Sequence, residues 1–466
     1  MIYYLIASIL AAASAFAARS ERQLTAAGGV FYAVQGAFAV WLLAGGLYGT
    51  TSATFFTFDA LGTLFFVLLA VVSCYAFFHS GAYLAGSDLR QTRTYFALLM
   101  LLTTAIAGAY FANNLAVTWI FLEATTLCSA GIVYHRRTAQ TLEAAWKYVF
   151  VCSTGIAMAY LGILLLAAAT KCESLSYDAV AAVAASGNPL YLKTAFLLIL
   201  CGYSCKVELF PLYTVGVDAN FAAPSPASAL ISTGLVNAGF LAVFRVYKLL
   251  AATDVFPWVQ SVLLLVGVLS LAIGALFLRR TNNYKRFLSY STVENMGIAA
   301  IGLGIGGIGV WAALFHVVCH TFIKSSLFLQ MAVVRQVYNG YRINRIGDYI
   351  HINRVGAVGL LTGMVVLLAF PPSPLFISEL TILKQVVTDR NWWLAAGVLL
   401  LLCIVIYAFS SRMLRLCYQS NQDEVHPSKA DKALSWSALS LLAAAVVLGM
   451  WQPGFLQRII SEIASL

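Results

Sequence analysis

Charged side chains are scarce in this sequence, and their scarcity decides the class of protein. Of the 466 residues, 10% are Asp, Glu, Lys or Arg, while 61% are hydrophobic and the mean hydropathy is +0.86. Ordinary soluble domains carry about 25% charged residues, so a soluble globular protein is excluded. No polar stretch is long enough for a separate soluble domain. Residues 1–466 are therefore expected to form a single integral membrane domain.

Motifs that hold metals or nucleotides are also missing. The nine cysteines form no Cys-x-x-Cys pair, which argues against an iron–sulfur cluster or a structural zinc held by this chain. His316 and His320 stand four residues apart, but Val317 takes the place of the glutamate in a zinc-protease motif, so no metal site is expected. The glycines of IGLGIGGIGV lie in a turn between two apolar runs, so they are not a nucleotide-binding fingerprint.

Long apolar runs are what the sequence has in abundance. A membrane-spanning helix needs about 20 apolar residues, and about fourteen runs approach that length. We therefore predict an all-α, polytopic membrane protein. The first run lacks a cleavage site followed by a polar domain, so it is expected to remain as a helix. The expected spans are 2–18, 28–48, 58–78, 94–113, 115–134, 142–168, 191–213, 226–250, 257–278, 284–303, 309–334, 355–387, 392–413 and 433–451.

Positive charge is distributed unevenly among the loops. Most Lys and Arg residues lie in the loops after odd-numbered spans, as Arg136, Arg137, Arg279 and Arg280 do. Loops rich in Lys and Arg stay in the cytoplasm. This bias predicts that both termini face the outer side of the membrane.

Two of the expected spans are interrupted by proline, which removes a backbone donor and clashes with the preceding turn. The interruptions are at Pro211 in one span and at Pro371, Pro372 and Pro374 in the other. Lys206 precedes the first break and Glu379 follows the second. The two broken spans stand five apart in order, so they run in opposite directions. This predicts two inverted repeats, residues 94–250 and 257–413, with sites at mid-membrane.

Ionisable side chains inside these apolar runs are the candidates for an ion path. A charge at the centre of a span costs roughly 2.5–3.5 kcal/mol, so such residues face other helices or trapped water rather than lipid. Three of them are spaced four apart and form one polar stripe on a helix. The predicted path residues are Glu123, Lys147, Lys206, His316, His320, Lys324 and Glu379. The alternative role for these side chains is a buried structural ion pair.

Secondary candidates flank the path. Glu143 is spaced to pair with Lys147 on one helical face. Glu208 lies beside the first break, and Asp218 follows it at a position that suits the cap of a short helix.

Several runs carry a family resemblance. The sequence resembles the proton-pumping, antiporter-like subunits shared by respiratory complex I, Mrp-type cation/proton antiporters and membrane-bound nickel–iron hydrogenases. Within that superfamily it is most similar to hydrogenase-4 component F, and the resemblance extends over about residues 59–384. The runs that carry it are FLEATTLCSA, EAAWKYVFVCS, GYSCKVELFPLYT, DANFAAPSPASAL, NNYKRFLSYSTVENMGI, FHVVCHTFIKSSLFL and PPSPLFISELTIL.

The resemblance assigns roles to individual residues. Glu123 matches the functional glutamate of the fifth helix, and Lys147 the lysine of the sixth. Lys206 matches the lysine of the first broken helix. The remaining matches are His320 and Lys324 for the polar residues of the eleventh helix, and Glu379 for the charge of the second broken helix.

The chain also departs from the family pattern at three positions. Asn220 and Asn295 stand where relatives have histidines, and Asn237 stands where complex I subunits often have a lysine. Two titratable imidazoles are thus absent, which makes a proton relay more dependent on water.

The resemblance implies a proton-translocating subunit of a membrane-bound redox complex of the hydrogenase-4 or formate hydrogenlyase type. It implies that this chain binds no cofactor, and that nickel–iron and iron–sulfur centres lie on partner subunits. The implied partners are other membrane subunits and a peripheral cytoplasmic redox arm, in a bacterial or archaeal cytoplasmic (inner) membrane. Two alternatives remain: a subunit of an Mrp-like Na⁺(K⁺)/H⁺ antiporter, and a membrane subunit of an inorganic-carbon uptake complex.

Overall fold

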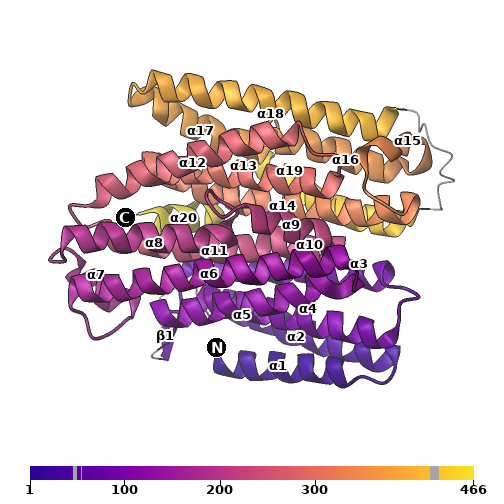
Figure 1. Cartoon of the computed structure of the whole chain (residues 1–466), viewed down its shortest axis with the longest axis horizontal. Helices are drawn as coiled ribbons and strands as arrows, with labels where there is room; N and C mark the ends of the chain where they lie inside the picture. The colour runs from indigo at the N-terminus through magenta and orange to yellow at the C-terminus, as the bar shows by residue number, and fades with distance from the viewer. Residues whose placement is uncertain (46–49, 54, 420–429, 466) are drawn as a thin grey trace. The chain divides into compact units, whose positions relative to one another are not determined.

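The computed structural model describes residues 1–45, 50–53, 55–419 and 430–465. The chain is built almost entirely from helices, and it divides into two compact units, Met1–Val259 and Gln260–Ser465. Eleven of the described helices are long and apolar enough to cross a membrane (Figure 1). The prediction of an all-α, polytopic membrane protein is confirmed. Residues 46–48, at the end of the second expected span, lie outside the described residues.

The first unit begins with a three-helix group and continues into the first broken span. A short antiparallel strand pair, β1 (Thr50–Ala53) and β2 (Phe56–Phe58), lies between α2 and α3. The helices are α1 (Ile2–Ala17), α2 (Glu21–Ala44), α3 (Ala60–Tyr83), α4 (Leu89–Phe111), α5 (Leu115–Val133), the 3-10 turn η1 (Tyr134–Arg136), α6 (Ala139–Thr170), α7 (Tyr177–Ala184), α8 (Pro189–Val207), α9 (Thr214–Ala222), α10 (Ser225–Leu230), the π-helical turn η2 (Ile231–Leu235) and α11 (Val236–Leu250).

The second unit holds the second broken span. Its first helix, α12, starts in the last residues of the first unit. The helices are α12 (Phe256–Leu278), α13 (Tyr284–Ile305), α14 (Ile308–Tyr338), the 3-10 turn η3 (Ile343–Arg345), α15 (Tyr349–Ile352), α16 (Arg354–Leu367), α17 (Pro374–Thr388), α18 (Trp392–Tyr418), α19 (Lys432–Met450) and α20 (Gly454–Ala464).

Three of the fourteen expected spans fall below the length and hydropathy of the other eleven. Helices α1 and α16 are apolar but shorter than the rest. Helix α13 has 22 residues but carries Lys285, Arg286 and Glu294, so it is less apolar than its neighbours. A helix is nevertheless present at each of these places in the chain.

The same local arrangement starts α5 in the first unit and α13 in the second. The Asn114 side chain accepts hydrogen bonds from the second and third backbone N–H groups of α5, and Asn283 does the same for α13. Each asparagine also forms an isolated antiparallel bridge, to Ser176 and to Arg342 respectively. Such caps satisfy N–H groups that have no partner within the helix. Helices α5 and α13 therefore begin in equivalent ways.

Both broken spans are confirmed, and they share a backbone pattern. The break between α8 and α9 contains Glu208 in the left-handed region (φ 60°), and the break between α16 and α17 contains Ala369 there (φ 54°). Pro211 and Pro372 each follow three residues later. Pro374 is the first residue of α17, where a proline costs no hydrogen bond, so it starts the second half-helix.

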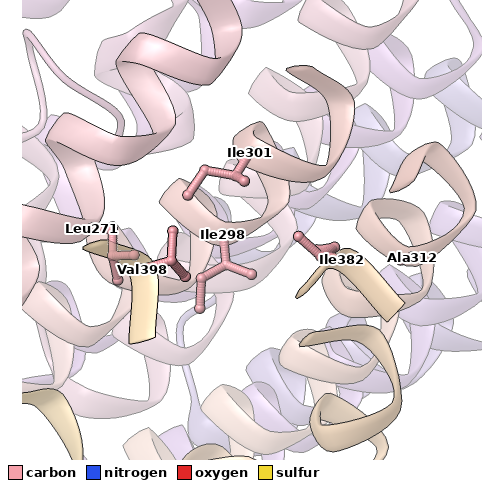
Figure 2. Close-up of a cluster of buried hydrophobic side chains, with 6 residues drawn as sticks. All are labelled: Leu271, Ile298, Ile301, Ala312, Ile382 and Val398. Carbon is pink, nitrogen blue, oxygen red and sulfur yellow. The ribbon is translucent and has the colours of Figure 1, made fainter. Parts of the chain in front are cut away.

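An apolar core joins five helices of the second unit (Figure 2). It fixes the rotation of α13, because Ile298 points into it and lies one turn after Glu294 on the same helical face. The cluster consists of Leu271 of α12, Ile298 and Ile301 of α13, Ala312 of α14, Ile382 of α17 and Val398 of α18.

Candidate functional site

Lys206, near the end of α8, is the centre of the polar cluster in the first unit. Its side chain is 1% exposed. The ammonium Nζ donates to the hydroxyl of Thr126 on α5 at 2.8 Å and to the phenol of Tyr148 on α6 at 3.4 Å. A buried charge is stable only when other groups pair with it or bind it through hydrogen bonds. Two neighbouring helices supply these groups.

Glu123 reaches Lys206 through a hydroxyl group. The Oγ1 atom of Thr126 donates to Oε2 of Glu123 at 3.1 Å while it accepts from Lys206. The other carboxylate oxygen accepts from Ser153 on α6 at 2.7 Å. The predicted pair of Glu123 and Lys206 is thus a three-membered chain, with Thr126 in the middle.

Small residues bring α6 and α8 close enough to form this cluster. A Cβ atom at Gly202 would lie 2.3 Å from the backbone oxygen of Gly155, and one at Gly155 would lie 2.9 Å from that of Gly202. Glycine pairs of this kind let membrane helices approach at backbone distance. Tyr148 and Lys206 are on these two helices, so the close packing sets the distance between them.

Glu208 lies at the first break and belongs to a second buried cluster. It is 1% exposed, and its Oε1 accepts from Nδ2 of Asn220 on α9 at 2.8 Å. A Cβ atom at Gly216 would lie within 2.7 Å of the Glu208 carboxyl, so the glutamate fills the space beside α9. Asn220, at the place of a histidine in relatives, therefore holds the carboxylate across the break.

Glu143 and Lys147 do not join the buried clusters. They form an ion pair at 2.5 Å on α6, as their spacing predicts, but their side chains are 64% and 57% exposed. The buried side of α6 instead carries Tyr148 and Cys152. The structure therefore places Lys147 apart from Lys206, although the sequence predicts both on one path.

The second unit contains a comparable chain of polar contacts around Lys324 of α14. This lysine is fully buried, and its Nζ donates to Oγ of Ser291 at 2.7 Å and to the backbone oxygen of Leu288, both on α13. The amide of Asn295 donates to the backbone oxygen of Ser291 at 2.7 Å and to Oε2 of Glu294 at 2.5 Å. One helix turn of α13 thus connects Lys324 to Glu294.

Glu294 and Glu379 line the same cavity. This cavity has a volume of about 300 Å³ and is bounded by α16, α17 and α18 and by the break between α16 and α17. Its other lining residues are mainly apolar. Glu379 follows Ala369 by ten residues, as Asp218 follows Glu208, so Glu379 is the positional counterpart of Asp218.

The two predicted histidines differ in their contacts. Nδ1 of His316 lies 2.9 Å from Oγ of Ser378 on α17. His320 is fully buried, and within the described part of the chain neither of its ring nitrogens has a protein partner. Buried polar atoms are almost always hydrogen-bonded, and water is the usual partner where protein groups are absent. The polar stripe on α14 thus has one arm bound to α17 and one site suited to water.

Several residues of these clusters could not be found from the sequence by the rules applied to it. Thr126, Tyr148, Ser153 and Ser291 are uncharged, and no spacing rule distinguishes them from structural residues. Glu294 is different, because it is the one acidic residue in its span. The rule that selects Glu123, a carboxylate inside an apolar run, would have found it. Among the described residues no group of three or more His, Cys, Asp or Glu side chains is placed to hold a metal ion.

Comparison with known proteins identifies the relatives of this chain. The family model described as "NADH:quinone oxidoreductase/Mrp antiporter, TM" matches residues 112–405. The chain is 28% identical over 407 residues to the hydrogenase-4 component F homolog of Methylacidiphilum infernorum, a match that covers 84% of this chain and 85% of that protein.

Solved structures share the fold. One is the membrane-bound sulfane sulfur reductase, an archaeal respiratory membrane complex, with a TM-score of 0.86 and 21% identity over 99% of this chain and 95% of that chain. Another is the Mrp complex from Dietzia sp., with a TM-score of 0.85 and 17% identity over 99% and 96% of the two chains.

Proposed function

Because the chain belongs to the NADH:quinone oxidoreductase/Mrp antiporter transmembrane family, we propose that this antiporter-like membrane subunit translocates protons in a redox complex of the hydrogenase-4 type. The family membership confirms the resemblance found in the sequence motifs. The single observation that carries the proposal is the buried Lys206, which is linked through the Thr126 hydroxyl to Glu123. An ionisable side chain of this kind inside the membrane marks an ion or proton path.

In the first unit, the Glu123 carboxylate stabilises the ammonium form of Lys206 through Thr126. When a charge on a neighbouring subunit draws Glu123 away, the dry site no longer stabilises that ammonium. Lys206 then releases a proton to water, and it is protonated again when Glu123 returns. The hydroxyl bridge lets the two charged groups separate without breaking a direct ion pair.

In the second unit, Lys324 takes up a proton and Glu294 and Glu379 release it. Asn295 holds Glu294 in place but cannot itself exchange protons at neutral pH, so water molecules carry the proton between Lys324 and the carboxyls. His320 suits a water-mediated step because both of its nitrogens lack protein partners in the described structure.

The energy for transport comes from partner subunits. Moving one elementary charge against 100 mV costs about 2.3 kcal/mol. Nickel–iron and iron–sulfur centres on the partners, in a peripheral cytoplasmic arm, supply it. The complex lies in the bacterial or archaeal cytoplasmic membrane, and both termini of this chain face the outer side.

Proton transport is tested with the complete complex reconstituted in liposomes that contain a pH-sensitive dye. The Glu379→Ala variant is expected to lose redox-driven proton movement. Lys384→Ala is the matched control, because Lys384 lies five residues further along α17 and is exposed. Equal loss in both variants, or wild-type transport in Glu379→Ala, would contradict the role given to Glu379.

The same vesicles discriminate the alternatives. A pH change that depends on Na⁺ or K⁺ and needs no redox substrate would assign Mrp-like cation/proton exchange instead. The partners that co-purify are a second criterion: a large nickel–iron hydrogenase subunit supports the proposal, and a zinc protein supports an inorganic-carbon uptake complex.

A further inference from the structure

A large apolar cavity lies in the first unit, away from the proposed proton path. It has a volume of about 660 Å³ and is enclosed by α2, α3 and the beginning of α4. Binding sites for small molecules usually measure about 300–1,000 Å³. Its walls are formed mainly by Leu24, Phe77, Phe78, Leu84 and Phe96. The three helices are candidate membrane spans, so an apolar hollow of this size is adjacent to lipid.

Glycines shape the inner surface of this cavity. A Cβ atom at Gly28 would lie 2.1 Å from the Phe77 ring, so α2 and α3 are in close contact there. At Gly29 and Gly81, in contrast, an added Cβ atom would meet nothing within 4 Å. Both of these glycines line the cavity, so the unoccupied volume lies directly beside them.

One end of the cavity is positively charged. Glu21, Leu89 and Thr92 line that end, at the starts of α2 and α4. Arg22, Arg90 and Arg93 adjoin these residues in the chain, and Arg19 precedes α2. The four arginines outnumber Glu21 and Asp88, the acidic residues of the same helix ends.

Arg93 has a donor to spare. Its Nη1 donates to the backbone oxygen of Ala18 at 3.3 Å, and its buried Nε has no protein partner among the described residues. Guanidinium groups form strong hydrogen bonds with phosphate oxygens. A phosphate at this end of the cavity would therefore be paired with both charge and hydrogen-bond donors.

We propose that this cavity binds an anionic phospholipid, with one acyl chain between α2 and α3 and its phosphate against the arginines. The apolar walls fit a hydrocarbon chain and the arginines fit an anion. A neutral isoprenoid quinone would match the walls but would leave the arginines without a counter-charge. A zwitterionic lipid would satisfy them less well than phosphatidylglycerol, because its cationic group lies next to its phosphate.

The experiment is native mass spectrometry of the full chain in mild detergent, after exchange of its native lipids. Phosphatidylglycerol and phosphatidylcholine with identical acyl chains are titrated separately. Wild-type protein is expected to bind phosphatidylglycerol about tenfold more tightly than phosphatidylcholine. Gly29→Leu and Gly81→Leu place a side chain in the cavity and are each expected to weaken phosphatidylglycerol binding about tenfold.

Two further variants separate the two ends of the site. Gly36→Leu is the matched control: Gly36 is seven residues after Gly29 on α2, its added Cβ would also meet nothing within 4 Å, and it does not line the cavity. It is expected to bind lipid as the wild type does. Arg22→Gln combined with Arg90→Gln changes two exposed arginines and is expected to abolish the preference for phosphatidylglycerol while acyl-chain binding remains.

Three results would overturn the proposal. One is unchanged phosphatidylglycerol binding in both Gly29→Leu and Gly81→Leu. Another is equal affinity of the wild type for the two lipids. The third is displacement of bound lipid by a short-chain quinone with an affinity that the arginine variants do not alter, which would assign the cavity to a quinone.

Discussion

At the scale of single residues, the two units use the same device. In each, a buried lysine donates to a hydroxyl, Thr126 for Lys206 and Ser291 for Lys324, and a carboxylate lies beyond that hydroxyl. A buried ion pair in direct contact is hard to separate, because removing one partner leaves an uncompensated charge. A hydroxyl can donate to one group and accept from the other while the distance between them changes. This arrangement suits a charge that must be released during transport.

The Thr126 hydroxyl can be removed with little change in shape. Thr126→Val is expected to slow redox-driven proton transport about 10- to 100-fold, because a hydrogen bond to a charged group contributes about 1.5–3 kcal/mol. Thr126→Ser keeps the hydroxyl and is expected to retain most of the activity. Initial rates of dye response in proteoliposomes provide the measurement. Normal rates in Thr126→Val would show that Glu123 and Lys206 do not act through this residue.

Glu294 is expected to be as important as Glu379. Because it is 4% exposed and lines the same cavity as Glu379, Glu294→Gln should remove a proton-carrying group without changing size or packing. Loss of proton movement with preserved assembly of the complex is the expected result. Glu143→Gln serves as the control, since Glu143 is 64% exposed and belongs to a different contact. If Glu294→Gln transports protons normally, the carboxyl has a structural role only.

The sequence predicts some of these residues and misses others for physical reasons. Lys206 and Lys324 are charges inside apolar runs, a signal that the cost of burial makes specific. Lys147 carries the same signal but lies outside the buried cluster, because α6 carries its small residues, Gly155 and Gly162 among them, on the opposite face. That pattern of small residues indicates which face packs, and it would have placed Lys147 outside. The hydroxyl bridge depends on helix rotation, which no single sequence fixes.

At the scale of helices, the contact between α6 and α8 determines whether the first cluster can form. The backbones approach each other at Gly155 and Gly202, and Gly162 contacts Ala195 in the same way one step further along. Side chains on two helices packed this closely keep fixed distances, which a path of hydrogen bonds requires.

Gly202→Ala tests this contact with a single added carbon. Its Cβ would lie 2.3 Å from a backbone oxygen that cannot move independently, so the expected loss is about 1–3 kcal/mol of stability, seen as a lower melting temperature in detergent. Gly397→Ala is the control, because an added Cβ on α18 meets nothing within 4 Å. A Gly202→Ala protein as stable as Gly397→Ala would mean that the two helices can separate without cost.

The helix breaks can be predicted from their prolines, but their backbone conformation cannot. Glu208 and Ala369 adopt positive φ values that asparagine or glycine would adopt more readily, so nothing in the sequence marks them. Helix α20 is absent from the expected spans, because its 11 residues are too few to cross a membrane. It buries Leu456, Ile459, Ile460 and Ile463, an amphipathic pattern that a search restricted to long apolar runs overlooks.

At the scale of the whole molecule, the uneven loop charge predicts the side of the membrane on which each loop lies. Single cysteines are placed at Ser186, in the loop before α8, and at Gln140, at the start of α6. An impermeant maleimide is expected to label Ser186→Cys in intact cells and Gln140→Cys only in inverted vesicles. The unmodified protein gives the background from its native cysteines. The opposite labelling pattern would reverse the proposed orientation.

The central claim is that buried ionisable side chains of this chain carry the transported proton. The most direct test is the ratio of protons moved to electrons transferred in the reconstituted complex that contains Lys206→Ala. The account predicts that electron transfer continues while this ratio falls to near zero, because the redox centres lie elsewhere and the proton path is interrupted. A ratio equal to that of the wild type would contradict the account.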